Sequence, residues 1–267
     1  MPRPPRVYKC SAIVLRQRKL GEADKIITLY TAEFGKVDAV AKGVRRVKSR
    51  LAGHVEPLRH GSFMLARGRN LDIVTQVQSI ESFQALRDDL NKLSHALYAA
   101  ELLDRATEER SENFDLYRLL LDTLRRFTER DDLERILRYY EMRLLMQLGY
   151  KPELELCVVC GSELGEGKVV RWVASLGGAV CPSCKPRDVS LRALPQESLA
   201  AMRMLQSDNA TVIDDLVLDH ETAHDIERIL RDAIHHALDQ DVRSAAFLAD
   251  VRRTARPVRQ TRDAGVR

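Results

Sequence analysis

The sequence predicts an α+β protein in which a small five-stranded β-barrel precedes an all-α domain with an inserted four-cysteine module. Three observations support this fold class. The first 80 residues contain five short segments rich in Val, Ile, Thr and aromatic residues, with turn residues between them. Beyond residue 83, apolar residues recur every three or four positions, as they do on one face of a helix. Two Cys-x-x-Cys pairs then interrupt the helical pattern.

The five expected strands cover residues 8–16, 25–31, 36–42, 62–66 and 71–77. Turn-forming segments such as 21–24 and 68–70 separate them, and these segments hold Gly together with Asp or Asn. Five strands in about 80 residues suit a small closed barrel, because closure leaves no exposed sheet edge. An OB-fold and an SH3-like barrel both fit this pattern, and the residues alone do not choose between them.

The helical pattern continues almost to the end of the chain. The expected helices cover residues 86–100, 116–127, 133–148, 195–206, 222–239 and 241–253. The third of them ends at Gly149, with Pro152 beyond it, and both residue types commonly stop a helix. We expect the short Arg-rich tail after Pro257 to be disordered.

Composition places the chain among globular proteins. It has 267 residues, of which 45% are hydrophobic and 31% are charged. Arg171 interrupts the most apolar stretch, residues 169–180, so no run is long enough to span a membrane. The first six residues do not resemble a secretory signal, and five cysteines, an odd number, argue against a secreted disulfide framework. We therefore expect a cytosolic protein.

Charge is distributed unevenly along the chain, although the formal net charge is only +4. Residues 1–80 hold 16 Lys and Arg against 6 Asp and Glu, whereas residues 81–249 hold 21 against 31. Residues 250–267 hold 6 against 2. A basic segment before an acidic one indicates a polyanionic partner for the basic part, and nucleic acid is the commonest polyanion.

The densest positive charge lies in residues 41–50, which hold five cations and no acid. The segment follows an expected strand and contains Gly43, so we interpret it as an exposed loop. Crowded cations repel one another, and a phosphate backbone would relieve that repulsion with release of counterions. A merely solvated loop is the alternative interpretation. The candidate DNA-binding residues are Lys42, Arg45, Arg46, Lys48 and Arg50, with Arg16 and Arg18 at the end of the first strand.

Aromatic residues are sparse in the basic segment, where only Tyr8, Tyr30, Phe34 and Phe63 occur, and we expect several of them in the barrel core. A single-strand binder usually stacks bases on exposed aromatic rings. Binding by this barrel should therefore be mostly electrostatic, weakly selective for sequence, and tolerant of both single and double strands.

The four-cysteine module consists of Cys157-Val-Val-Cys160 and Cys181-Pro-Ser-Cys184. Two residues between thiolates allow a tight turn to direct both sulfurs at one ion, and two such pairs complete a tetrahedral zinc site. Four cysteines leave no open coordination position, so we expect one structural Zn²⁺ ion. A redox dithiol or an iron–sulfur cluster is the alternative. Trp172 is positioned to cover the site, and Cys10 is expected to be a small buried hydrophobic residue.

The segment His220-Glu221-Thr222-Ala223-His224 matches the H-E-x-x-H motif of zinc proteases. We do not expect catalysis here, because Asp219 and Thr222 look like helix-start residues that would leave His220 outside the helix. The extended motif also fails, since Glu227 and Leu230 occupy its Gly and His positions. No catalytic residue is therefore assigned.

Taken in order, these segments resemble one family, the RecO proteins of bacterial DNA repair and recombination. The resemblance covers roughly residues 8–185, and the C-terminal helices fit more loosely. It is carried by residues 12–15, 21–25, 31–35, 41–50, 98–103 and 148–152 and by the cysteine block 157–184.

The resemblance implies that residues 1–81 form a basic, DNA-binding OB-fold. It implies a helical domain in residues 82–151 and 189–256, and a zinc-ribbon-like insertion in residues 152–188. Residues 257–267 remain as a basic tail. By position, the basic run 42–50 would face DNA.

The resemblance also implies a non-enzymatic mediator of the RecF pathway. Such a protein binds single- and double-stranded DNA, anneals complementary strands, and helps load RecA onto strands coated with single-stranded DNA-binding protein. The implied partners are RecR and the acidic C-terminal tail of single-stranded DNA-binding protein, and the implied location is the cytoplasm, at the nucleoid. The tail pocket does not transfer residue by residue, and Arg125, Arg126 and Arg130 are its candidate cations. The alternative function is a zinc-containing adaptor whose barrel binds RNA or protein.

Overall fold

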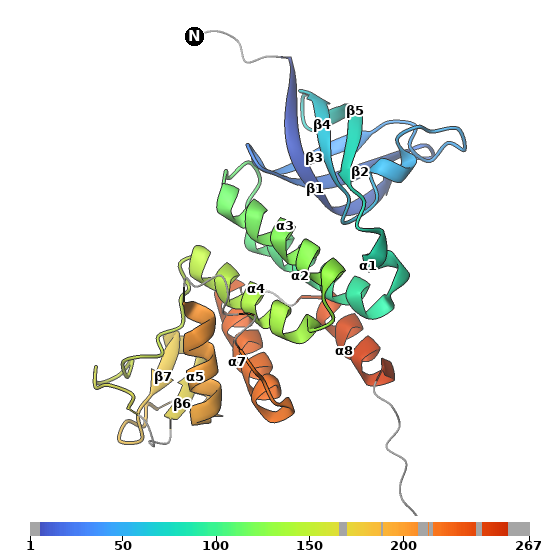
Figure 1. The fold of residues 1–267 in the computed structure, drawn as a ribbon. Coiled ribbons are helices and arrows are strands. Elements are labelled where there is room, and N and C mark those ends of the chain that lie inside the picture. Colours follow the sequence, from blue (N-terminus) through green and yellow to red (C-terminus); the bar gives the residue numbers. More distant parts are fainter. Residues whose placement is uncertain are drawn as a thin grey trace, which may run out of the picture.

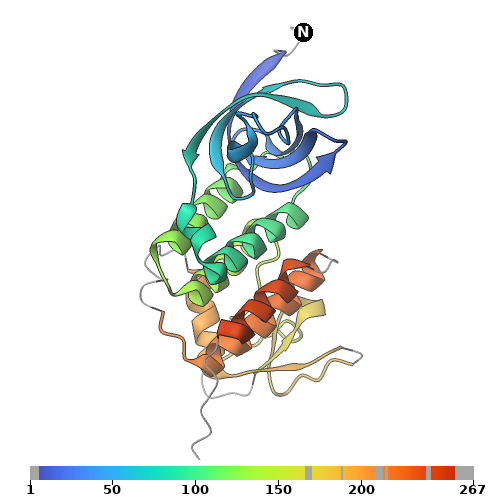
Figure 2. The same cartoon turned by 90° about the vertical axis from the view of Figure 1, so that its right-hand side faces the viewer.

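The computed structural model describes residues 6–165, 170–187, 189–207, 213, 216–238 and 242–255. Figure 1 shows an elongated molecule with the barrel at one end, the helices in the middle and the small sheet that contains β6 (Val170–Val173) and β7 (Gly178–Val180) at the other end. Figure 2 shows the same order from the side. No helix within the described residues is long and apolar enough to cross a membrane.

The N-terminal barrel consists of five strands that close in the order β1-β2-β3-β5-β4. Its strands are β1 (Val7–Leu20), β2 (Asp24–Thr31), β3 (Gly35–Ala41), β4 (His60–Ala66) and β5 (Asp72–Glu81). Neighbouring strands are antiparallel except for the parallel pair β3 and β5. The expected five-stranded OB-type barrel is confirmed, although β1 and β5 each run four residues beyond their expected ends.

The long first strand closes the barrel because it serves two neighbours. Its first half pairs with β4 and its second half pairs with β2, and the register shifts between Val14 and Arg16. Such an irregularity bends a strand and increases its twist, as closure requires. Cys10 lies inside the barrel with 1% of its surface exposed, and desolvation raises the pKa of its thiol to about 12. It is a buried hydrophobic residue, as expected.

The helical body follows the barrel directly. Its helices are α1 (Gln84–Asp88), α2 (Leu90–Ala106), α3 (Phe114–Glu129), α4 (Leu133–Gln147), α5 (Gln196–Gln206), α7 (His220–Leu238) and α8 (Ser244–Ala255). The sequence suggested one continuous helix at residues 86–100, and this was wrong. Asp89 separates α1 from α2, because its carboxylate accepts hydrogen bonds from the backbone N–H groups of Asn91 (2.8 Å) and Lys92 (3.1 Å) and so starts a new helix.

A small sheet beside the cysteines has the strand order β7-β6-β8. It consists of β6 (Val170–Val173), β7 (Gly178–Val180) and β8 (Arg192–Leu194). The third strand comes from beyond residue 188, the expected end of the insertion, and leads into α5. Trp172 of β6 is 1% exposed and belongs to the same buried cluster as Cys157 and Cys181.

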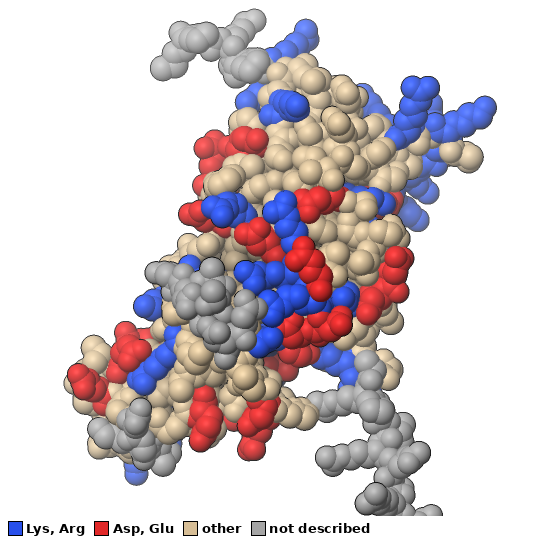
Figure 3. Space-filling view, in the orientation of Figure 1, with Lys and Arg blue, Asp and Glu red and all other residues tan. Residues whose placement is uncertain are grey.

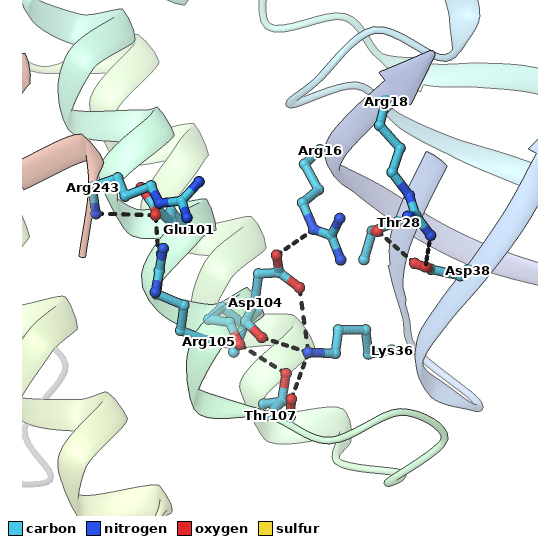
Figure 4. Close-up of polar contacts among 11 residues, drawn as sticks. Arg16, Arg18, Thr28, Lys36, Asp38, Glu101, Asp104, Arg105, Thr107 and Arg243 are labelled. Atoms are coloured by element: carbon cyan, nitrogen blue, oxygen red, sulfur yellow. Dashed lines mark hydrogen bonds and ion pairs between the residues drawn. The ribbon is translucent and has the colours of Figure 1, made fainter. Parts of the chain in front are cut away.

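The barrel is fixed to the helical body through the loop that follows α2 (Figure 4). Lys36 of β3 donates through Nζ to the carbonyl oxygens of Asp104 and Thr107, at the end of α2. The backbone N–H of Arg110 donates in turn to the carbonyl oxygen of Lys36 at 2.8 Å, and a parallel bridge joins Lys36 to Glu109. The loop therefore extends the sheet edge of β3 and positions the barrel against α2.

Candidate nucleic-acid interface and metal centre

The basic run forms a loop after β3. Backbone hydrogen bonds and one buried side chain attach this loop to the barrel. We call residues 42–50 the basic loop. The N–H of Gly43 donates to Asp24 Oδ1 at 2.7 Å, and the N–H of Arg45 donates to the carbonyl oxygen of Ala23 at 2.9 Å. Val44 is 2% exposed and packs into the barrel core. These contacts hold the loop against the turn between β1 and β2.

All five cations of the basic loop are exposed to solvent: Lys42, Arg45, Arg46, Lys48 and Arg50. Within the described residues, none of them forms an ion pair with a carboxylate, and Arg45 Nη1 donates to the carbonyl oxygen of Gly21 at 3.0 Å. In Figure 3, Lys and Arg side chains project from the barrel at the upper right, where the ribbon of Figure 1 places this loop. Their charge is available to an anion.

The other two candidate cations, Arg16 and Arg18, lie on β1 and already contact carboxylates. Arg16 Nε donates to Asp104 Oδ2 of α2 at 2.5 Å, and Arg18 Nη2 lies 3.5 Å from Asp38 Oδ2 (Figure 4). Both arginines are about half exposed, with 48% and 57% of their side-chain surface accessible. They therefore lie beside the interface as partly neutralised cations, unlike the basic loop.

The aromatic residues of the barrel provide no open stacking surface. Tyr8, Tyr30 and Phe63 are buried, and Phe34 packs edge-on against Tyr8 with ring centroids 4.8 Å apart. The sequence reasoning that placed several of them in the core was right, but it did not consider aromatic residues beyond the barrel. Tyr150, directly after α4, is 54% exposed, and its exposure depends on the tertiary arrangement.

The four cysteines converge on one point from two tight turns. Their sulfur atoms lie within 4.8 Å of one another, and the Sγ atoms of Cys160 and Cys181 are 3.8 Å apart. In the first turn, Gly161 has φ +71° and its N–H donates to the carbonyl oxygen of Cys157 at 2.8 Å. In the second, the N–H of Cys184 donates to the carbonyl oxygen of Cys181 at 3.2 Å. The group fits a tetrahedral metal ion with four sulfur ligands.

The electrostatics of this cluster favour a cation at its centre. Burial opposes ionisation of Cys157, but backbone N–H groups, that of Cys181 foremost, outweigh it and lower the pKa of Cys157 to about 6. Hydrogen bonds to Cys160 and then to Cys181 raise the pKa of Cys184 to about 12. Four thiolates this close repel one another, so full ionisation requires the positive charge of a metal.

The H-E-x-x-H segment lies at the start of α7, and one expectation about it was wrong. Helix α7 begins at His220, because the carboxylate of Asp219 accepts the N–H of Thr222 at 2.7 Å and caps the helix. His220 and His224 line a cavity of about 730 Å³ together with Glu134 and Glu227. Among the described residues, only the four cysteines bring three or more metal-ligand atoms together. The motif therefore forms no ready three-ligand centre.

The arginines suggested for an acidic tail are largely paired. Arg125 donates to both carboxylate oxygens of Glu81, at 3.0 and 2.7 Å, and Arg130 contacts Asp132 at 3.1 Å. Neither the cavity at α7 nor the cleft described below is lined by Arg125, Arg126 or Arg130.

Together, the fold and the two sites define a class: OB-fold proteins that carry an exposed basic loop on a helical body with a four-cysteine metal module. Comparison with known families identifies the particular family within this class. The model described as Recombination protein O N terminal matches residues 6–83, and the model described as Recombination protein O C terminal matches residues 87–246. The chain belongs to the RecO family.

Individual relatives agree over nearly the whole chain. A DNA repair protein RecO from Roseiflexus sp. (strain RS-1) is 43% identical over 254 residues, which cover 94% of this chain and 88% of the relative. The DNA repair protein RecO of Symbiobacterium thermophilum is 38% identical over 94% of this chain and 99% of its own. That of Pelotomaculum thermopropionicum is 39% identical over 91% and 94%.

Proposed function

We propose that this protein is a DNA-binding recombination mediator of bacterial DNA repair that acts without catalysis of its own. It binds single- and double-stranded DNA, anneals complementary strands, and helps load RecA onto strands coated with single-stranded DNA-binding protein. The observation that carries the proposal is the basic loop, whose five exposed cations have no carboxylate partner within the described residues. Membership of a family of DNA repair proteins supports it.

The charge distribution indicates where DNA binds. Residues 81–249 hold 31 acids against 21 bases, so the helical body as a whole repels a phosphate backbone. Figure 3 shows Asp and Glu interspersed with Lys and Arg over the helices, in contrast to the edge of the barrel. DNA contact therefore concentrates on the barrel and on the surface next to it, and the helical body is left for protein partners.

The four-cysteine group is proposed to bind one structural Zn²⁺ ion through Cys157, Cys160, Cys181 and Cys184. The four sulfur atoms lie close enough together to coordinate one ion tetrahedrally, which is the geometry zinc prefers. Four protein ligands leave no open coordination position for a substrate. When bound, the ion supplies charge neutralisation and a covalent-like link between the two turns. The cysteines orient β6 and β7, which lie between the two Cys-x-x-Cys pairs.

The partners proposed from the family are RecR and the acidic tail of single-stranded DNA-binding protein, with RecA reached indirectly on the coated strand at the nucleoid. An acidic peptide requires cations that still have N–H groups to donate. All three guanidinium nitrogens of Arg125 contact Glu81 or Asp122, and two of those of Arg130 contact Asp132, so we assign the tail to no pocket on α3.

The decisive experiment measures annealing of two complementary labelled oligonucleotides, each coated with single-stranded DNA-binding protein, without ATP. Acceleration by substoichiometric protein is expected. The Arg45→Ala/Arg46→Ala variant should lose most of it. The matched control, Arg118→Ala/Arg231→Ala, removes two exposed arginines from α3 and α7 and should retain it. No acceleration by the unmodified protein would overturn the mediator function.

A further inference from the structure

A cleft of about 550 Å³ opens where the barrel meets the helical body. Its walls come from β1, β3, the end of α2 with the following loop, the segment after α4, and the end of α7. Three cations line it, Arg16, Lys36 and Arg105, together with Tyr150. A groove that combines cations with an accessible aromatic ring is the combination that single-stranded nucleic acid requires.

Tyr150 is held in this cleft by the way α4 ends. Gly149 adopts φ +85°, and the N–H of Tyr150 donates back to the carbonyl oxygen of Leu145 at 2.8 Å, which forms a Schellman-type helix end. The backbone of Tyr150 is therefore fixed, while its side chain is 54% exposed. An accessible tyrosine ring on a fixed backbone has only two side-chain torsions to order when a base stacks on it.

A line of cations connects the basic loop to this cleft along β1. Arg45 contacts the carbonyl oxygen of Gly21, in the turn that ends β1, and Arg18 and Arg16 follow on the same face of the strand. From Gly21 to Arg16 the strand covers five residues, or roughly 16 Å at about 3.3 Å per residue. Figure 4 shows Arg18 and then Arg16 approaching α2.

Two carboxylates near the cleft are neutralised by cations. Asp104 contacts both Arg16 and Lys36, and Glu101 contacts Arg105 at 2.8 Å. Arg16 uses only Nε for Asp104 among the residues drawn in Figure 4, so its two terminal nitrogens can donate to a phosphate. Glu108 lines the cleft without an ion pair to another described residue. We therefore expect phosphates on the β1 side of the cleft, away from Glu108.

We propose that this cleft receives one base of single-stranded DNA, stacked on Tyr150, with the neighbouring phosphates on Arg16 and Arg18. The inference rests on the proposed DNA-binding function and adds a second contact region to the basic loop. It makes the protein prefer single strands at this point, because bases paired in a duplex cannot stack on a protein ring.

The test compares Tyr150→Ala and Tyr150→Phe with the unmodified protein. Affinity for an oligothymidine should fall about tenfold in Tyr150→Ala and stay near normal in Tyr150→Phe, which keeps the ring. Affinity for a duplex and the salt dependence of binding should not change, since no phosphate contact is lost. Irradiation of a strand containing 5-iododeoxyuridine should attach the base to Tyr150, as identified by mass spectrometry.

Failure of this inference is distinguishable from failure of the proposed function. If Tyr150→Ala binds single strands normally while Arg45→Ala/Arg46→Ala binds weakly, the cleft is no DNA site and the mediator function stands. Equal losses for single strands and duplexes in Tyr150→Ala, or a lowered melting temperature, would assign Tyr150 a structural role and overturn the inference. An unmodified protein that binds no DNA would remove both proposals.

Discussion

Gly35 in β3 and Ser111 in the loop after α2 are in such close contact that no side chain fits between them. A Cβ atom on Gly35 would lie 1.9 Å from the carbonyl oxygen of Ser111. Gly35 also has φ +62°, a backbone conformation that costs other residues free energy. This contact lies beside Lys36 and is part of the connection between the barrel and the helical body.

Replacing Gly35 with Ala should therefore destabilise the protein strongly. We expect Gly35→Ala to lower the free energy of unfolding by about 2–4 kcal/mol, since strain and displacement of the loop act together. The control is Gly21→Ala, because Gly21 has a similar φ of +57° but open space around its Cβ position. Denaturant unfolding measures both. Equal losses of unfolding free energy in the two variants would mean that only backbone strain destabilises the protein and that the loop containing Ser111 moves aside.

The basic loop should account for much of the salt dependence of DNA binding. Arg45→Ala/Arg46→Ala should weaken binding to any sequence about equally. It should also reduce the slope of log affinity against log salt on single strands by about 1.4, roughly 0.7 for each lost phosphate contact. Titrations at several salt concentrations measure the slope. A slope unchanged from that of the unmodified protein would remove the loop from the DNA surface.

Loss of one cysteine ligand should affect stability before DNA affinity. Cys157→Ser should abolish stoichiometric zinc and lower the melting temperature by roughly 5 °C or more, because the turns then lose their common ligand. DNA affinity of the folded fraction should remain. Cys10→Ala, in the barrel core, should keep one zinc per chain. Lost affinity at normal stability would instead make the cysteine module a DNA contact.

Stability should fall at mildly acidic pH because of His60, the first residue of β4, whose side chain faces α3. Burial lowers the pKa of His60, and its contact with Glu81 opposes this only in part. The ring also contacts the hydroxyl of Tyr117 at 2.7 Å. Since the unfolded chain binds the proton more readily, the free energy of unfolding should decline as pH falls below about 6.5, the ordinary histidine value, and level off below the folded pKa.

Thermal unfolding between pH 7.5 and 5.5 tests this dependence. His60→Gln should reduce the slope of stability against pH in this window, whereas His236→Gln, at an exposed position on α7, should leave it as it was. If His60→Gln retained the full slope, the acid sensitivity would have to reside in other groups.

The sequence predicted the barrel well because its signals are local. Enrichment in Val, Ile, Thr and aromatic residues between turn segments identified all five strands, whereas the end of β5 at Gln78–Glu81, where three of the four residues are polar, was missed. The four-cysteine cluster and the exposed basic loop were also predictable, because each depends on a short stretch of sequence. The break at Asp89 depends on one side-chain cap, and the three-residue strand β8 is too short to show a period.

The cleft could not have been predicted from the sequence, since it depends on contacts between distant segments. Arg16 and Asp104 are 88 positions apart, and only the folded chain shows that they pair. Tyr150 is one aromatic residue after a helix, and nothing in its neighbours indicates that it faces β1. Long-range packing determines both.

The attachment of Lys36 to the end of α2 has a mechanical consequence. Its amino group binds the carbonyl oxygens of Asp104, in the last turn of α2, and of Thr107, which caps that helix, while its backbone belongs to the barrel sheet, so β3 and the end of α2 are joined directly. The basic loop directly continues β3. A force on this loop is therefore transmitted through β3 to α2.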